Sequence, residues 1–215
     1  MKIYCDSCDV KAIKKYKELG IVDGITTNPS IIGKSGRNFK EVVTEICKII
    51  DTSVSVEVMA NEYESMLTEA EEFRNIASQI TIKLPITENG LKACKTLSER
   101  GIAVNMTLCF SPAQALLAAK VGATYVSPFI GRLDDMGRDG LDLIADICTI
   151  YGNYPDISTQ ILAASIRNSM HIIEVAKLGV DVITLSPKLI STMIDNPLTE
   201  KGMNIFLNDW KKVKV

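Results

Sequence analysis

The run ITIKLP at residues 80–85 mixes apolar with β-branched residues and ends at a proline, as a buried strand does. Side chains alternate between the two faces of a strand, so Lys83 points away from the face that Ile82 and Leu84 share. Burial removes water from an ammonium group and favours the neutral amine, which is a nucleophile toward a carbonyl carbon. The ordinary alternative is a lysine at a strand end whose amine reaches back to water. The rest of the chain decides between these interpretations.

Strands and helices alternate along the whole chain, and no Ser-, Gly- or Pro-rich linker divides it. Segments rich in Val and Ile predict strands at 1–7, 24–28, 54–59, 80–85, 103–108, 124–129, 159–165 and 182–185. Helical spacing of apolar residues predicts helices at 10–19, 39–50, 62–77, 89–99, 111–120, 140–151 and 169–178, a short one ending at 194, and a last one at 200–212.

Eight strand–helix units in 215 residues predict an α/β fold, a (β/α)8 TIM barrel with an extra C-terminal helix. We expect a single domain over residues 1–215, with 197–215 as a helical extension. An open, doubly wound sheet is the rival fold. It is disfavoured because the chain has no G-x-G-x-x-G after its first strand.

The charge and hydropathy of the chain argue against two classes of partner, nucleic acids and membranes. The net charge of -2 gives no support to binding of nucleic acid or of a membrane surface. No segment is apolar over the length that a bilayer requires, and the start MKIYCDSCD lacks the apolar core of a signal peptide. We therefore expect a cytoplasmic protein with neither nucleic-acid nor membrane partners.

The six cysteines lie mostly inside apolar segments, which favours reduced core thiols over a disulfide framework. Only Cys5-x-x-Cys8 has the spacing of half a zinc site or a redox pair. A structural zinc needs two more ligands, and the chain offers no second C-x-x-C and a single histidine, His171. We therefore predict buried thiols, and we interpret His171 as a residue on a helix face.

Polar residues follow seven of the eight predicted strands. A parallel barrel carries its catalytic groups at the carboxyl ends of its strands, pointing inward. The residues at or near these ends are Asp6, Thr26, Asn28, Glu57, Lys83, Asn105, Thr107, Ser127, Arg132, Ser165 and Arg167. Because seven strands supply such groups, we predict a functional site at the carboxyl end of the barrel.

Lys83 with Asp6 and Glu57 combines an amine nucleophile with two carboxylates that can move protons. Water held between Glu57 and Thr107 can relay protons while an imine forms. Asp6 can take a proton from a hydroxyl and so drive cleavage of the adjacent carbon–carbon bond. These residues favour Schiff-base chemistry on a sugar-like substrate.

The remaining polar residues fit a phosphorylated polyol. Asn28, Asn105 and Ser127 offer neutral hydrogen bonds that suit hydroxyl groups. Arg132 and Arg167 suit a phosphate, which barrels often hold in this region. A surface salt bridge is the alternative for the arginines, because two aspartates follow Arg132 closely.

Four stretches of this sequence resemble the transaldolase family, and its short branch in particular, which also contains the fructose-6-phosphate aldolases. They are DGITTNPSII (23–32), ITIKLP (80–85), NMTLCFSPAQALLAAKVGATYVSPFIGRLDD (105–135) and AASIRN (163–168). The resemblance covers essentially the whole chain. It implies a barrel enzyme that forms a Schiff base and moves a dihydroxyacetone unit between phosphorylated sugars, with no metal or other cofactor.

The resemblance also implies roles for single residues. By position, Lys83 forms the Schiff base, Asp6 is the acid of the first strand, and Glu57 with Thr107 holds a water. The substrate contacts implied are the amides of Asn28 and Asn105 and the phosphate ligands Arg132, Ser165 and Arg167, and we add Thr26, Ser127 and Phe129 to the predicted substrate-binding set.

Two positions separate transferase from aldolase in this family. The aldolases carry glutamine where this chain has Glu57 and tyrosine where it has Phe129, so both residues here are of the transaldolase type. We expect transfer from sedoheptulose 7-phosphate or fructose 6-phosphate to an aldose phosphate, in the non-oxidative pentose phosphate pathway. Release of free dihydroxyacetone by an aldolase is the alternative, and a noncatalytic sugar-phosphate-binding protein is a remote one.

The C-terminal segment carries a candidate contact surface. Met203, Phe206 and Trp210 share one face of the last predicted helix. Short members of the family form rings of five subunits that often pair into decamers through this helix. The resemblance therefore implies a homo-oligomer, a pentamer or a decamer. A helix folded back over its own barrel is the alternative.

Overall fold

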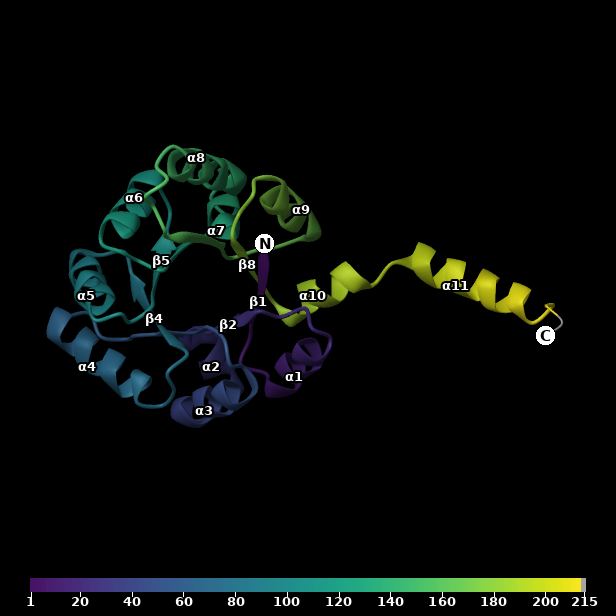
Figure 1. The fold of residues 1–215 in the computed structure, drawn as a ribbon, viewed down its shortest axis with the longest axis horizontal. Helices are drawn as coiled ribbons and strands as arrows, with labels where there is room; N and C mark the ends of the chain where they lie inside the picture. Colours follow the sequence, from purple (N-terminus) through teal and green to yellow (C-terminus); the bar gives the residue numbers. More distant parts are fainter. Residues whose placement is uncertain (214–215) are drawn as a thin grey trace.

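The computed structural model describes residues 1–213, and these fold into a closed barrel of eight parallel strands in sequence order (Figure 1). The strands are β1 Lys2–Asp6, β2 Gly24–Thr26, β3 Val54–Glu57, β4 Ile80–Pro85, β5 Val104–Cys109, β6 Tyr125–Pro128, β7 Gln160–Ala163 and β8 Val182–Leu185. Strand β1 pairs with both β2 and β8, which closes the barrel. The predicted (β/α)8 barrel is confirmed, and the open doubly wound sheet is excluded.

Most of the helices surround the strands on the outside of the barrel (Figure 1). The helices are α1 Val10–Glu18, α2 Pro29–Ser35, α3 Phe39–Ile49, α4 Tyr63–Arg74, α5 Glu88–Glu99, α6 Pro112–Lys120, α7 Ile130–Asp134, α8 Gly140–Gly152, α9 Ser169–Lys177, α10 Pro187–Ile194 and α11 Pro197–Trp210. Side-chain caps begin most of them, as when Asp9 accepts hydrogen bonds from the first turn of α1. None of the helices within residues 1–213 has the length and apolar character needed to cross a membrane.

Two short helices, α2 and α7, were not predicted. Each directly follows a strand, and each is too short to show a helical repeat of apolar residues. Strands β2, β3 and β7 end two residues earlier than predicted, at Thr26, Glu57 and Ala163. The residues beyond them form loops at the carboxyl end of the barrel, where a site is expected.

Side chains fill the amino-terminal end of the barrel. Tyr4 and Tyr125 meet there, with their hydroxyls 3.0 Å apart, and they pack with Leu162 and Val182. Gly24 makes room for this layer, because a Cβ at that position would lie 2.6 Å from Cζ of Tyr4. Open space is thus confined to the carboxyl end. A larger apolar core fills the layer between strands and helices.

Strand β5 contains an irregularity. Its register against β6 shifts between Met106 and Cys109, and Leu108 adopts a positive φ of 58°. Strict alternation along the strand would place Leu108 on the face opposite Asn105, but the bulge interrupts the alternation, and Leu108 lines the cavity at the carboxyl end of the barrel.

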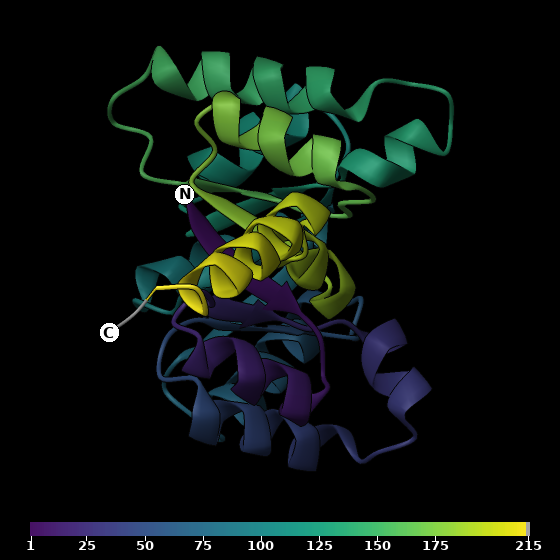
Figure 2. The same cartoon turned by 90° about the vertical axis from the view of Figure 1, so that its right-hand side faces the viewer.

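Helix α11 extends away from the barrel and ends far from it (Figure 1), and in the view of Figure 2 it lies in front of the barrel. It begins at Pro197, where the Asn196 side chain accepts from the Leu198 N–H, rather than at the predicted 200. None of its side chains is buried, so within the described residues it does not fold back over the barrel. Residues 214–215 of the predicted extension lie outside the described residues.

Candidate active site

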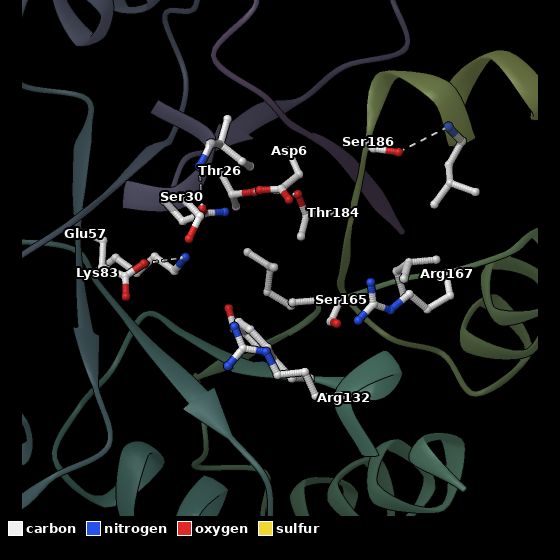
Figure 3. Close-up of a pocket in the computed structure, with 18 of the residues that line it drawn as sticks. Asp6, Thr26, Ser30, Glu57, Lys83, Arg132, Ser165, Arg167, Thr184 and Ser186 are labelled. Atoms are coloured by element: carbon white, nitrogen blue, oxygen red, sulfur yellow. Dashed lines mark hydrogen bonds and ion pairs between the residues drawn. The ribbon is translucent and has the colours of Figure 1, made fainter. Parts of the chain in front are cut away.

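A cavity of about 780 Å³ opens at the carboxyl ends of the strands. Every predicted site residue except Asn105 and Thr107 lines it. Figure 3 shows Glu57 and Lys83 on one side of this cavity and Ser165 and Arg167 on the other. Residues scattered between positions 6 and 167 therefore meet in one space.

Lys83 lies at the floor of the cavity. Its register partner on β3 is Glu57, and the lysine Nζ is 3.0 Å from Glu57 Oε2. The same nitrogen donates to the Thr27 carbonyl at 3.2 Å. The lysine side chain is only 7% exposed, so the alternative of an amine that reaches bulk water is wrong. The amine is held between a carboxylate and a carbonyl, facing the cavity.

Asp6 projects into the same cavity from the end of β1. The Thr26 hydroxyl donates to Asp6 Oδ1 at 2.7 Å, and the Thr184 hydroxyl lies 2.6 Å from that of Thr26. Burial raises the pKa of Asp6 above its ordinary range, while the Thr26 hydrogen bond and the charge of Lys83 oppose the rise. Asp6 therefore titrates closer to neutrality than an exposed aspartate.

Below the cavity lies a buried polar layer. Ser127 Oγ donates to Asn105 Oδ1 at 2.7 Å, and Asn105 Nδ2 donates to Ser55 Oγ at 3.2 Å. Ser127 lines the cavity, whereas Asn105 lies beneath it and fixes its hydroxyl. Thr107 is also fully buried, and its hydroxyl has no hydrogen-bond partner within residues 1–213. Buried hydroxyls are normally paired, so Thr107 is an exception that needs a reason.

Asn28 occupies the N-cap of α2 and lines the cavity. Its Oδ1 accepts from the Ile31 N–H at 2.9 Å. Because the oxygen is used in the cap, the amide NH2 group remains available to donate to a hydroxyl in the cavity.

Three predicted phosphate ligands line the far side of the cavity. Arg132 has no carboxylate within ion-pair distance in the described part of the chain, and its guanidinium lies 5.2 Å from the Phe129 ring centroid. Arg167 pairs with Asp135 at 2.8 Å, so the surface salt bridge considered as an alternative exists for Arg167. Ser165 has a positive φ of 60°, a strained backbone of the kind that gathers at binding sites.

Several lining residues were not predicted. They are Pro29, Ser30, Ile31, Lys34, Leu108, Leu162, Ala164, Ile166, Thr184, Ser186, Lys188, Leu189 and Thr192. Thr184 could have been predicted from the rule on strand ends, because it points inward and alternates with buried Ile183 and Leu185 on β8. Lys34 could not have been predicted, because its place depends on helix α2, which was not predicted.

Cys5 in β1 and Cys8 just after it are both buried, as predicted. Burial raises the pKa of Cys5 to about 12, and Cys8 Sγ donates to the Ile31 carbonyl at 3.4 Å. No group of three or more His, Cys, Asp or Glu side chains suited to a metal occurs within residues 1–213.

Comparisons with known proteins agree with this geometry. A family model described as transaldolase/fructose-6-phosphate aldolase matches residues 3–214. A probable transaldolase of Nitrosopumilus maritimus is 52% identical over all of this chain and 96% of its own length. A probable transaldolase of Brucella anthropi is 57% identical over 99% of this chain and 97% of its own length.

A solved structure, the thiamine phosphate pyrophosphorylase of Pyrococcus furiosus, shares the fold. Its TM-score is 0.58 at 17% identity, over 86% of this chain and 85% of that one. At this identity the likeness concerns the barrel alone. The family match and the two relatives, in contrast, extend along almost the entire sequence. The chain therefore belongs to the transaldolase/fructose-6-phosphate aldolase family.

Proposed function

We propose that this chain is a class I transaldolase that carries a dihydroxyacetone unit on Lys83. The donor is a ketose phosphate, sedoheptulose 7-phosphate or fructose 6-phosphate, and the acceptor is an aldose phosphate. The reaction belongs to the non-oxidative pentose phosphate pathway in the cytoplasm. The main support is a buried lysine 3.0 Å from one carboxylate, in a cavity that also holds the half-buried carboxyl of Asp6.

Imine formation uses Lys83 and Glu57. Proton transfer from the ammonium to Glu57 frees the amine, which attacks the C2 carbonyl of the ketose and forms a carbinolamine. Glu57 then returns a proton to the carbinolamine oxygen, which leaves as water. The unpaired hydroxyl of buried Thr107 is suited to hold a water that relays these protons.

Bond cleavage uses Asp6. Its carboxylate takes the proton of the C4 hydroxyl, the C3–C4 bond breaks, and its electron pair moves into the imine to give an enamine. The aldose phosphate leaves, and another aldehyde accepts the enamine carbon in the reverse step. Water then hydrolyses the new imine and frees Lys83. Asn28 and Ser127 can hold the hydroxyls of the three-carbon unit throughout.

The phosphate of donor or acceptor lies against Arg132, Ser165 and Arg167 in this proposal. Lys34 and Lys188 also line the cavity, and neither forms an ion pair within the described residues. A cavity with this excess of positive charge suits a phosphorylated substrate.

Transfer is favoured over release of free dihydroxyacetone by the residues that face the enamine. Phe129 lines the cavity with an apolar ring, which packs edge-on against Phe110 at 5.8 Å. A ring without a hydroxyl cannot place water beside the enamine carbon, so the enamine waits for an acceptor aldehyde. The aldolase reaction therefore remains the second candidate.

Borohydride trapping tests the proposal. With fructose 6-phosphate present, the reductant should fix a three-carbon adduct on Lys83, readable by peptide mass. Lys83→Met should abolish the adduct and lower turnover by several orders of magnitude. Asp6→Asn, the matched variant, should still form an adduct with the whole sugar but lose turnover, because only cleavage needs this base. A Lys83→Met protein with more than a few per cent of activity contradicts the proposal, and a noncatalytic binder would give no adduct.

We also propose that the protein is a homo-oligomer, a pentamer or a decamer. The support is α11, which has no buried side chain and exposes 73% of Phe206 and 66% of Trp210. Large apolar side chains exposed together mark contact surfaces, and a second copy of the chain is the partner that we propose.

A further inference from the structure

The anion-binding side of the cavity is built from two segments that the sequence separates by more than thirty residues. Arg132 lies in α7, whereas Ser165 and Arg167 lie in the loop between β7 and α9. Two backbone hydrogen bonds join the segments, from Ile130 N to the Ala164 carbonyl and from Gly131 N to the Ser165 carbonyl. The spacing of the two arginines therefore depends on how firmly this loop is held against α7.

His171, the only histidine of the chain, bridges the same two segments. Its Nε2 lies 3.2 Å from the carboxylate of Asp134 at the end of α7, and its Nδ1 accepts from the Arg167 backbone N–H at 3.4 Å. The imidazole is 12% exposed and does not line the cavity. It reaches the site indirectly, through the backbone of Arg167 and through Asp134 of α7.

Both partners of the imidazole are themselves fixed. Asp134 uses its other oxygen, Oδ1, to accept from the Gly140 N–H at 2.9 Å. A proton on Nε2 satisfies the carboxylate, and the remaining nitrogen, Nδ1, is then the acceptor that the Arg167 N–H requires. The guanidinium of Arg167 is held separately by Asp135.

Capping of α9 does not require this side chain. The N-cap is Asn168, whose Oδ1 accepts from the His171 backbone N–H at 3.0 Å. The imidazole instead turns back toward the loop before the helix. A bond between a side chain in the first helical turn and the residue before the cap fixes the path of the chain into the helix.

We infer that His171 is a positioning residue, which sets the phosphate-binding loop by holding the Arg167 backbone to α7. The inference rests on the proposed role of Arg132, Ser165 and Arg167 in phosphate binding. A loop that shifts by a fraction of an ångström misaligns a two-arginine clamp, because hydrogen bonds to phosphate depend steeply on distance and angle. Loss of His171 should therefore weaken binding of the phosphate group and leave the chemistry at Lys83 intact.

Three substitutions test separately the two hydrogen bonds that His171 makes, to Asp134 and to the Arg167 N–H. His171→Gln can still donate to Asp134 from the position of Nε2 but has no acceptor at the position of Nδ1. His171→Asn keeps an acceptor near Nδ1 and loses the reach to Asp134, and His171→Phe removes both bonds at similar size. Met170→Ala, at an exposed side chain next to the histidine, is the control.

The measurements are kcat and KM for erythrose 4-phosphate and for erythrose, with fructose 6-phosphate as the saturating donor, and inhibition by inorganic phosphate. We expect His171→Phe and His171→Gln to raise KM for erythrose 4-phosphate and the phosphate inhibition constant about tenfold, with kcat and the KM for erythrose changed less than about twofold. Because the bridge needs both bonds, His171→Asn should raise both constants as His171→Gln does, and Met170→Ala should match the parent.

Equal rises in KM for both acceptors, or a lowered melting temperature with an unchanged phosphate inhibition constant, would overturn the inference and make His171 a structural residue only. Equal KM values for erythrose and erythrose 4-phosphate in the parent protein would instead overturn the proposed phosphate site itself. The two failures are therefore distinguishable in one set of assays.

Discussion

Asp6 is the residue whose ionisation the site controls most directly. Burial raises its pKa, and a neutral Asp6 cannot take a proton from the substrate. The hydrogen bond from Thr26 opposes that rise by stabilising the carboxylate. If Thr26 donates its one hydroxyl proton to Asp6, Thr184 must donate to Thr26 in turn. The row of two threonines, in which Thr184 supports the hydrogen bond from Thr26, thus opposes the rise in the pKa of the proposed base.

Thr26→Val tests this row by removing the hydroxyl at nearly constant volume. At low pH, turnover should be lost because Asp6 becomes protonated. Without the hydrogen bond from Thr26, which lowers the pKa of Asp6, that pKa rises further. The acid limb of kcat should therefore move to higher pH. Since a hydrogen bond to a charged group contributes about 1.5–3 kcal/mol, kcat on that limb should fall roughly tenfold or more. Thr26→Ser keeps a donor and should keep the parental profile; superimposable profiles for all three proteins contradict this role of Thr26.

Phe129→Tyr tests what decides whether the enamine is transferred to an acceptor aldehyde or is released as free dihydroxyacetone. The new hydroxyl would point into the cavity and could hold a water beside the enamine carbon. We expect the ratio of dihydroxyacetone release to transfer to rise about tenfold, a modest gain for a positioned proton donor. Phe110→Tyr adds the same group on the partner ring, which does not line the cavity, and should leave the ratio unchanged. Equal ratios in all three proteins would show that partition is set elsewhere.

Residue types and strand alternation predicted most of the floor of the cavity. Lys83 and Glu57 were both predicted near inward-facing strand ends, and in the structure they are register partners on β4 and β3. The threonine row was only half predicted. The strand-end rule could have placed Thr184 inward, but its contact with Thr26 depends on closure of the barrel, which brings β8 beside β1. Such pairings depend on contacts between residues more than 150 positions apart, which a local pattern does not contain.

At the scale of elements, the junction between α7 and the loop after β7 carries the proposed phosphate site. Gly131 lies at the centre of this junction. A Cβ there would overlap Arg167 Nε and the Ser165 carbonyl oxygen, so the helix and the loop can approach this closely only with glycine. The sequence showed GRLDD as a motif, but the short helix α7 has no apolar repeat that could predict its contact with the loop after β7.

Gly131→Ala should force the loop away from α7. The backbone oxygen of Ser165 cannot move aside as a flexible side chain can, so we expect overpacking to cost about 1–3 kcal/mol of the free energy of unfolding. KM for a phosphorylated acceptor should rise about tenfold, because Arg167 moves with the loop. Kinetics and thermal denaturation measure the two effects.

The control for this substitution is Gly152→Ala, at a helical position where nothing lies within 4 Å of the added Cβ. It should leave KM unchanged and keep or slightly raise stability, since alanine is the better helix former. A Gly131→Ala protein with parental KM and stability would mean that the loop tolerates the added carbon, against the expectation.

At the scale of the whole molecule, the barrel was the easiest feature to predict. Eight short apolar strands alternate with helices along the chain, so errors in single boundaries do not change the topology. The direction of α11 was not predictable in the same way. Its apolar side chains indicate that something covers them, but whether that is the chain's own barrel or another copy depends on the two residues between α10 and α11.

The last prediction tests the proposed assembly. Phe206 and Trp210 lie one turn apart on α11 and are exposed in the single chain. Phe206→Glu with Trp210→Glu should lower the subunit number, because burying two carboxylates in an apolar interface is strongly unfavourable. The subunit number is measured by light scattering or by sedimentation.

Asn204→Glu with Asn208→Glu is the matched control, because it adds the same charge on the opposite side of the same helix. The control pair should keep the parental subunit number. Truncation after Asn196 should give the same small species as the Phe206/Trp210 pair, since no α11 side chain contributes to the core of its own barrel. A parent chain that is already monomeric, or a subunit number that survives both the charge pair and the truncation, would exclude α11 as the contact between copies.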